Sequence, residues 1–389
     1  MKFLHTADWH TGKTLKGRDR LEEQRAVLAE IVKIAEEQQV DAVLIAGDVY
    51  ESSAPSAQAQ HLVVQTLLRL RRAGAEVIAI AGNHDHPPTF DAYRPLMGEV
   101  GITLVGTARP PDKGGVVRFR ARSGGEDVQL AVLPFLTPRY AVRAAEIMTQ
   151  TPAENVRAYD DQIRRLVDAL TSGFAGDTVN VAMSHMTCIG GIFGGGERAA
   201  QSIFEYSVPA SILPVSAHYV ALGHLHRRQA LPAHCPVHYS GSPIAVDFGE
   251  QGNTSVVCLV EATPSTPARV TDIPVTSGRR LRTVRGTVAE LEAQAGSFGQ
   301  DYLRVWVREP ARAGLREAVA GILPNALEVR IDPEFAAPAR EGRADTADVR
   351  KTPGQLFADY CASAGVADSR VAALFAELHE EVTSADTAS

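Results

Sequence analysis

The sequence is poor in cysteine, and its few cysteines form no recognisable motif. The 389 residues include four cysteines, which lie far apart and show no CxxC spacing: Cys188, Cys235, Cys258 and Cys361. This pattern disfavours a disulfide-stabilised secreted domain and a cysteine-based zinc site. We therefore expect reduced thiols in a cytoplasmic protein.

Long apolar runs are also missing. No run approaches the roughly 20 residues that span a bilayer, and the opening MKFLHTADWH lacks the apolar segment of a signal peptide. We expect no association with a membrane.

The chain has no excess of positive charge. It contains 39 lysines and arginines against 46 acidic residues, which gives a net charge of −7. This balance argues mildly against a protein that grips nucleic acid on its own, because phosphate binding depends on Lys and Arg. DNA remains possible as a substrate if a local basic patch, metal ions or a partner subunit supply the positive field.

Apolar runs of strand length alternate with amphipathic stretches of helical length up to about residue 273. Such alternation is typical of a layered α/β domain. The predicted helices are 21–38, 56–73 and 153–171. The predicted strands are 2–7, 42–46, 77–81, 179–183, 219–223, 237–241 and 255–260, with a β-rich stretch at 102–136.

A β-α-β-α-β pattern follows, with strands at 281–286, 302–308 and 326–332 and helices at 288–295 and 312–322. The polar stretch after it reads as a linker, and two short amphipathic helices close the chain. So small a helix pair cannot bury a stable core alone, which favours docking on a larger partner over packing back on its own chain. The predicted boundaries are 1–275, 276–336, 337–354 (linker) and 355–382.

Five polar clusters directly follow strand-like runs. They are ADWH at 7–10, GDV at 47–49, GNHD at 82–85, SH at 184–185 and GHLH at 223–226. In open α/β sheets, ligands bind outside the carboxyl ends of the strands. We expect these clusters to converge on one site.

Carboxylates, an amide and imidazoles, with no thiolate, form a ligand set that suits Mn²⁺, Fe or Zn²⁺. Asp8 and His10 are two apart, so in an extended segment they point the same way, and His224 and His226 share that spacing. Two ions about 3.5–4 Å apart need a bridging carboxylate, for which Asp48 is the candidate. We expect two divalent ions, with Mn²⁺ as the first choice.

The five motifs, in this order, resemble the calcineurin-like metallophosphoesterase superfamily. The resemblance implies a layered β-sandwich flanked by helices. It also implies one ion on Asp8, His10, Asp48 and His226, and a second on Asp48, Asn83, His185 and His224. His84 would lie beside the scissile phosphate as a general acid or transition-state stabiliser, and Asp85 would orient His84.

FLHTADWHTGK at 3–13 and GDVYESSAPS at 47–56 resemble the SbcD nucleases, bacterial relatives of the nuclease in double-strand-break repair complexes. The resemblance implies a DNA-contacting capping domain at 276–336 and a C-terminal helix pair that docks the ATPase SbcC. It further implies a homodimer through the nuclease domain, within a heterotetramer. The implied activity is 3′–5′ exonuclease and endonuclease cutting of DNA, including hairpins and blocked ends, in repair, recombination and replication. At Tyr50-Glu51 that group more often has an aromatic residue followed by Asp, and we expect little to depend on this difference.

Several features leave alternatives open. His5 is either a buried structural residue or catalytic, and His86 either contacts substrate or lies on the surface. The glycine run at 190–198 lacks the P-loop arrangement and favours a flexible loop. The basic stretch is either a solvated strand edge or a phosphate contact: Arg279, Arg280, Arg282 and Arg285. The remaining histidines are expected to be ordinary: His61, His218, His234, His238 and His379.

Two other functions compete with a nuclease. A phosphatase or cyclic-nucleotide phosphodiesterase would use the same ions on another substrate, although it needs neither the capping unit nor the helix pair. A non-catalytic scaffold would keep only a remnant of the site, which the complete ligand set disfavours.

Overall fold

The computed structural model describes residues 1–137, 152–197 and 207–335, together with five positions beyond them: Phe357, Cys361, Val371, Leu374 and Phe375. The chain divides into two compact units, Met1–Phe335 and Ala336–Ser389. Within the described ranges, no helix is both long enough and apolar enough to cross a membrane.

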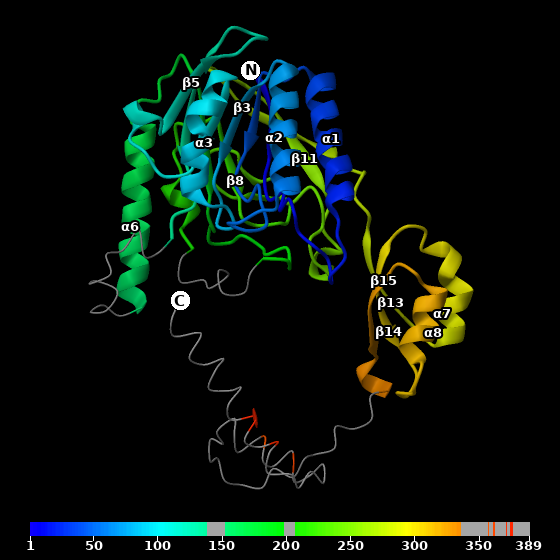
Figure 1. Ribbon diagram of the computed structural model, residues 1–389. Helices are drawn as coiled ribbons and strands as arrows, with labels where there is room; N and C mark the ends of the chain where they lie inside the picture. The colour runs from blue at the N-terminus through cyan, green and yellow to red at the C-terminus, as the bar shows by residue number, and fades with distance from the viewer. Residues whose placement is uncertain are drawn as a thin grey trace. The chain divides into compact units, whose positions relative to one another are not determined.

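Two sheets stand at the centre of the first unit (Figure 1). The first has the order β12-β11-β1-β2-β3-β4 and the second the order β5-β6-β7-β8-β10-β9. The strands of the first are β1 (Lys2–Thr6), β2 (Ala42–Ile45), β3 (Glu76–Ile80), β4 (Ile102–Val105), β11 (Val256–Thr263) and β12 (Thr266–Pro274). Those of the second are β5 (Val116–Arg120), β6 (Asp127–Leu133), β7 (Val179–His185), β8 (Tyr219–Gly223), β9 (Gln229–Leu231) and β10 (Val237–Tyr239).

Alternating side chains of the strands divide between two cores. Phe3 packs in the core between the sheets, whereas Leu4 packs under the helices on the outer face of the first sheet. Both side chains are fully buried. Strands buried on both faces are continuously apolar, which is why these segments read as unbroken apolar runs.

Helices cover the outer faces of both sheets. The first sheet is covered by α1 (Leu21–Gln38), α2 (Ala57–Arg72) and α3 (Pro87–Glu99), which Figure 1 shows on the same side. The second is covered by α6 (Pro152–Thr171). The predicted layered α/β architecture is confirmed.

The predictions missed α3 and two edge strands, β9 and β12. Helix α3 begins with two prolines, contains Pro95, and buries only Phe90 and Met97, so it lacks a helical apolar stripe. Strand β12 is mostly exposed and therefore carries no apolar run.

The predicted β-α-β-α-β unit is confirmed as a parallel sheet, in the order β13-β14-β15. Its elements are β13 (Leu281–Gly286), α7 (Val288–Gln294), β14 (Tyr302–Val307), α8 (Leu315–Ile322) and β15 (Ala326–Ile331). It has its own apolar core. Hydrogen bonds from Thr276 and Ser277 to Glu30, and from Arg279 to Glu23, tie the preceding segment to α1.

The second unit is described at five positions, all of them helical. The rings of Phe357 and Phe375, one from each predicted C-terminal helix, stack with their centroids 4.0 Å apart. The predicted linker at 337–354 lies outside the described residues. The four domain boundaries stay predictions.

Phe3 tests the core between the sheets. Replacing Phe3 with Ala removes a fully buried ring that meets the ring of Tyr219 edge-on. The free energy of unfolding should therefore fall by about 3–5 kcal/mol. Leu96, which is 65% exposed on α3, is the control, and Leu96→Ala should change stability by less than about 0.5 kcal/mol. Urea unfolding measures both, and equal midpoints would contradict this account of the core.

Candidate metal centre

The five predicted clusters come together at the carboxyl ends of the strands. Asp8 follows β1, Asp48 follows β2, and Asn83 follows β3 in the first sheet. From the second sheet, His185 ends β7 and the GHLH cluster follows β8. Their ligand atoms form three overlapping groups, each within 4.8 Å: Asp8, His10 and His226; His10, Asp48 and His84; Asp48, His185 and His224.

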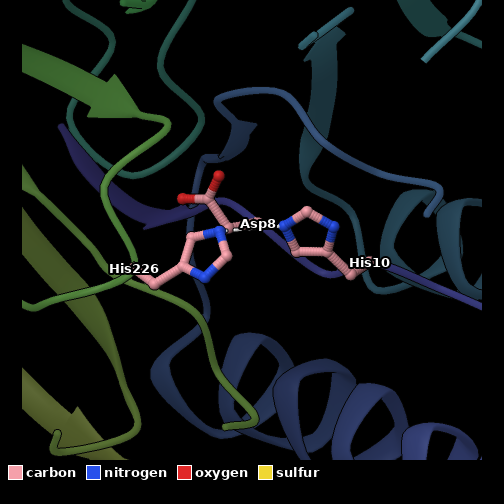
Figure 2. Close-up of side chains that lie close together, drawn as sticks. All are labelled: Asp8, His10 and His226. Atoms are coloured by element: carbon pink, nitrogen blue, oxygen red, sulfur yellow. Dashed lines mark hydrogen bonds between the residues drawn. The ribbon is translucent and has the colours of Figure 1, made fainter. Parts of the chain in front are cut away.

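The first pocket is made by Asp8, His10 and His226, whose side chains face one another (Figure 2). All three are buried. The Nε2 atoms of His10 and His226 lie 3.0 Å apart. Two imidazole nitrogens that converge so closely need a proton or a cation between them.

The second pocket is centred on the side-chain oxygen of Asn83. This Oδ1 lies 2.8 Å from His185 Nε2 and 2.8 Å from His224 Nδ1. His185 Nδ1 donates to the carbonyl oxygen of Ala46 at 2.7 Å, which turns Nε2 toward the pocket. Asn83 thus lies beside the two histidines that are predicted to share an ion with it.

Asp48 lies between the two pockets. Its Oδ2 is 3.5 Å from His185 Nε2 and 3.7 Å from His10 Nε2. Its Oδ1 accepts the backbone N–H of His84 at 2.8 Å. This position is the one that a bridging carboxylate requires.

Four of the candidate ligands have a positive φ: Asp8 (54°), His10 (45°), Asp48 (50°) and His224 (101°). Positive φ is rare for residues other than glycine, and such strain concentrates at functional sites. The positive φ values also correct the expectation that strand alternation places the side chains of Asp8 and His10 on the same side. Strand β1 ends at Thr6, and a left-handed turn brings the two side chains together instead.

The spacing argument also fails for His224 and His226. These two side chains enter different pockets, His224 the second and His226 the first. The positive φ of His224 breaks the extended backbone on which the argument depended. The assignment implied by the family resemblance also gives these two histidines to different ions, and it stays a prediction.

Two glycines make room for this arrangement. A Cβ on Gly82 would lie 2.2 Å from Asp48 Oδ1, and one on Gly47 would lie 2.3 Å from His185 Nδ1. Both contacts are far inside van der Waals distance. The strand ends can approach closely only because these residues have no side chain.

Each pocket holds one charged and one neutral imidazole. Burial opposes a charged His226, but its hydrogen bond to Glu250 outweighs burial and raises its pKa to about 9. Asp48 likewise overcomes burial at His185 and raises that pKa to about 9. Burial lowers the pKa of His10 to about 4 and that of His224 to about 3.

The carboxylates differ from each other as well. Burial raises the pKa of Asp8 to about 7. Burial opposes ionisation of Asp48 too, but His185 beside it holds the pKa of Asp48 well below its usual value. Near neutral pH each pocket therefore carries one excess proton on a histidine, which a bound cation would replace. Oxygen and nitrogen donors without thiolate fit divalent ions such as Mn²⁺, Fe²⁺ or Zn²⁺.

His84 is buried beside the first pocket, with its Nε2 3.9 Å from Asp48 Oδ2. Its Nδ1 bonds the backbone oxygen of Glu51 at 2.8 Å. The carboxylate of Asp85, the residue predicted to orient His84, accepts the backbone N–H groups of Val49, Tyr50 and Gly82. These bonds tie together the loops that carry Asp48 and His84, and the orienting role stays a prediction.

Sequence reasoning missed three glutamates of the site. Glu51 accepts from His10 Nδ1 at 3.0 Å, and Glu250 accepts from His226 Nδ1 at 2.5 Å. Glu51 therefore contacts a candidate ligand, and the expectation that little depends on having Glu rather than Asp at position 51 stays a prediction. Glu51 lies three residues after Asp48 and could have been noticed, whereas no motif surrounds Glu250.

The third glutamate, Glu197, binds the backbone of the glycine run. Its carboxylate accepts the N–H groups of Gly194, Gly195 and Gly196, and also the backbone N–H of His226 at 3.0 Å. The described part of this run, up to Glu197, is thus tied to the first pocket by the chain's own carboxylate.

The contacts of His5 and His86 bear on the alternatives that the sequence left open. His5 is buried, its Nδ1 lies 2.9 Å from the Tyr219 hydroxyl, and it belongs to neither pocket, which supports the structural alternative. His86 is exposed, and its ring bonds the hydroxyl of Thr89. This contact supports the surface alternative.

A family comparison agrees with the fold. The family model described as calcineurin-like phosphoesterase matches residues 1–228. That range contains all seven candidate ligands and more than half of the chain. The chain belongs to the calcineurin-like phosphoesterase family.

Within this family the chain is similar to several bacterial proteins, each named as the D component of the nuclease SbcCD. That of Bacillus subtilis (strain 168) is 39% identical over 287 residues, covering 72% of this chain and 71% of the relative. That of Rhodobacter capsulatus is 34% identical, covering 70% and 69%. That of Escherichia coli (strain K12) is 28% identical, covering 76% and 73%.

Gly82 tests the close approach of the strand ends. Gly82→Ala should displace the Asp48 carboxylate and weaken binding of Mn²⁺ at both pockets, because Asp48 lies between them. Gly176 is the matched control, since a Cβ there meets nothing within 4 Å. Equilibrium dialysis with Mn²⁺ measures the effect, and unchanged binding by Gly82→Ala would contradict the assignment of Asp48.

The raised histidine pKa values predict how ion binding depends on pH. His226 and His185, with pKa values of about 9, are protonated below that pH and must lose a proton to bind an ion. The apparent affinity for Mn²⁺ should therefore rise with pH from about 7.5 to 9, where Asp8 is already ionised, with release of about one proton per ion. Calorimetry in buffers of different ionisation enthalpy measures the protons, and pH-independent affinity without proton release would contradict the charge assignment.

Proposed function

We propose that this chain is the DNA-cutting subunit of an SbcCD-type repair complex and hydrolyses phosphodiesters with two divalent ions. One observation carries the chemistry: side chains from five strand-end clusters converge as two pockets on either side of Asp48. The site supports phosphoester hydrolysis, and the relatives named for the nuclease SbcCD support DNA as the substrate. Mn²⁺ is the ion we propose.

Seven residues would hold the ions. Asp8, His10 and His226 would bind the first; Asn83, His185 and His224 would bind the second; and Asp48 would contact both. Bound there, the ion pair would supply charge neutralisation at the phosphate and a more acidic attacking water.

His84 would act at the departing oxygen. A carbonyl oxygen only accepts, so the hydrogen bond to Glu51 places a hydrogen on His84 Nδ1 and leaves Nε2 directed at the site. With a proton on Nε2 as well, the ring is a donor for the leaving oxygen or for the charge on the transition state.

DNA contact is proposed for the segment that leads into the β13–β15 sheet. An open groove there is lined by Asn253, Arg279, Arg280 and Arg282. Arg282 is already paired with Asp301 at 2.8 Å, whereas Arg280 and Arg285 are exposed. The exposed pair is therefore the better candidate for phosphate contact than the paired arginine.

The C-terminal helix pair is proposed to dock the ATPase partner SbcC. Val371 and Leu374 are 37% and 55% exposed there, which leaves apolar surface for a partner. A homodimer within a heterotetramer, a cytoplasmic location, and 3′–5′ polarity with cutting of hairpins and blocked ends complete the proposal.

Purified chain, alone and with its partner ATPase, can be given Mn²⁺ with linear duplex DNA, hairpin DNA and a chromogenic phosphodiester. We expect the DNA substrates to be cut in the presence of the partner. Cleavage of the small ester alone would favour a phosphatase or small-substrate phosphodiesterase. Absence of any turnover would favour a scaffold.

His84→Ala tests the catalytic assignment. The variant should bind Mn²⁺ normally, because His84 is outside the seven proposed ligands, but its rate of DNA cleavage should fall by about 10²–10⁴-fold. His61, exposed on α2, is the control, and His61→Ala should cut DNA at the normal rate. Cleavage by His84→Ala at the wild-type rate would remove His84 from the mechanism.

A further inference from the structure

The two histidines of the first pocket are each held from behind by a carboxylate. His226 Nδ1 bonds Glu250 Oε1 at 2.5 Å, and His10 Nδ1 bonds Glu51 Oε2 at 3.0 Å. An ionised carboxylate only accepts hydrogen bonds, so both Nδ1 atoms carry hydrogens. The two Nε2 atoms, 3.0 Å apart, are then the atoms available to an ion.

The second pocket lacks this arrangement at His185. Its Nδ1 donates to a neutral acceptor, the carbonyl oxygen of Ala46. His224 directs Nδ1, not Nε2, at Asn83. A carboxylate behind a ligand histidine makes the imidazole a stronger donor to a metal than a carbonyl does, and it fixes the ring's orientation.

Glu250 is the more buried and more firmly held of the two carboxylates. Its side chain is 1% exposed, and its second oxygen accepts the backbone N–H of Val246 at 2.7 Å. The Glu51 side chain is 22% exposed and shares its charge with Lys13 at 2.7 Å. Solvent and Lys13 both screen the negative charge of Glu51, so Glu51 has a weaker electrostatic effect on His10.

We propose that Glu250 and Glu51 are positioning residues that make the first pocket the stronger of the two ion sites, so that it fills first. Glu250 has the larger effect. This inference rests on the proposed function, because it assumes that the two pockets bind ions.

The test isolates the first pocket by removing a ligand of the second. His224→Ala should bind a single Mn²⁺ with the affinity of the first step in the wild-type chain. Adding Glu250→Gln should weaken this binding by about 10–100-fold, the usual effect of losing such a partner. Adding Glu51→Gln should weaken it less, and Glu51→Asp, which keeps the carboxylate, should restore most of the affinity.

Glu197 supplies the matched control. It also contacts His226, but through the backbone N–H and not the ring. Glu197→Gln in the His224→Ala background removes a similar charge, and it should change the affinity much less than Glu250→Gln does. Free Mn²⁺ measured by electron paramagnetic resonance gives the affinities, and thermal unfolding verifies that each variant is folded.

The outcomes separate the inference from the function beneath it. Suppose that the wild-type chain binds two Mn²⁺ ions, and that His224→Ala binds one ion equally tightly with and without Glu250→Gln. This result would overturn the inference but not the proposed function. An equal loss from Glu197→Gln would overturn it too, because the charge rather than the contact with the ring would then matter. No Mn²⁺ binding by the wild-type chain would overturn both. If Glu250→Gln does not fold, the Glu51→Gln variant provides the test, because Glu51 is partly exposed. Unchanged Mn²⁺ affinity in Glu51→Gln would then overturn the inference.

Discussion

The structure depends on one close contact between two imidazole nitrogens, which requires a proton or a cation between them. The Nε2 atoms of His10 and His226 face each other at 3.0 Å, deep in the protein, and each ring is held there by a carboxylate. Without a proton or cation between them, two nitrogen lone pairs would repel each other. In the absence of metal the raised pKa of His226 supplies that proton, and a divalent ion would take its place.

The two-sheet architecture makes this contact possible. One sheet supplies Asp8, Asp48 and Asn83, and the other supplies His185, His224 and His226, so neither sheet alone holds a complete pocket. The apolar core between the sheets fixes their separation. Core stability and ion binding are therefore linked, because loosening the sandwich would move the two halves of the site apart.

Much of the fold and the membership of the site followed from local sequence. Helix 21–38 and the buried strands carry clear apolar periodicity, and each ligand cluster directly follows such a strand. The backbone geometry did not follow, because left-handed conformations at Asp8, His10, Asp48 and His224 are imposed by tertiary contacts. Glu250 was invisible for the same reason, since it meets His226 across 24 residues and no repeat or motif marks it.

The same limit explains the elements that were missed. Helix α3 is held by two buried side chains rather than by a stripe, and β12 pairs with β11 as an exposed edge. Pairing and burial by neighbours determine both structures, and neither leaves a periodic signal in its own segment.

The central claim is that this site holds two cations. Crystals grown with excess Mn²⁺ and measured by anomalous scattering test it most directly. We expect one peak among Asp8, His10 and His226 and another among Asn83, His185 and His224, with the Asp48 carboxylate within reach of both. The absence of Mn²⁺ from these pockets in such crystals would contradict the claim.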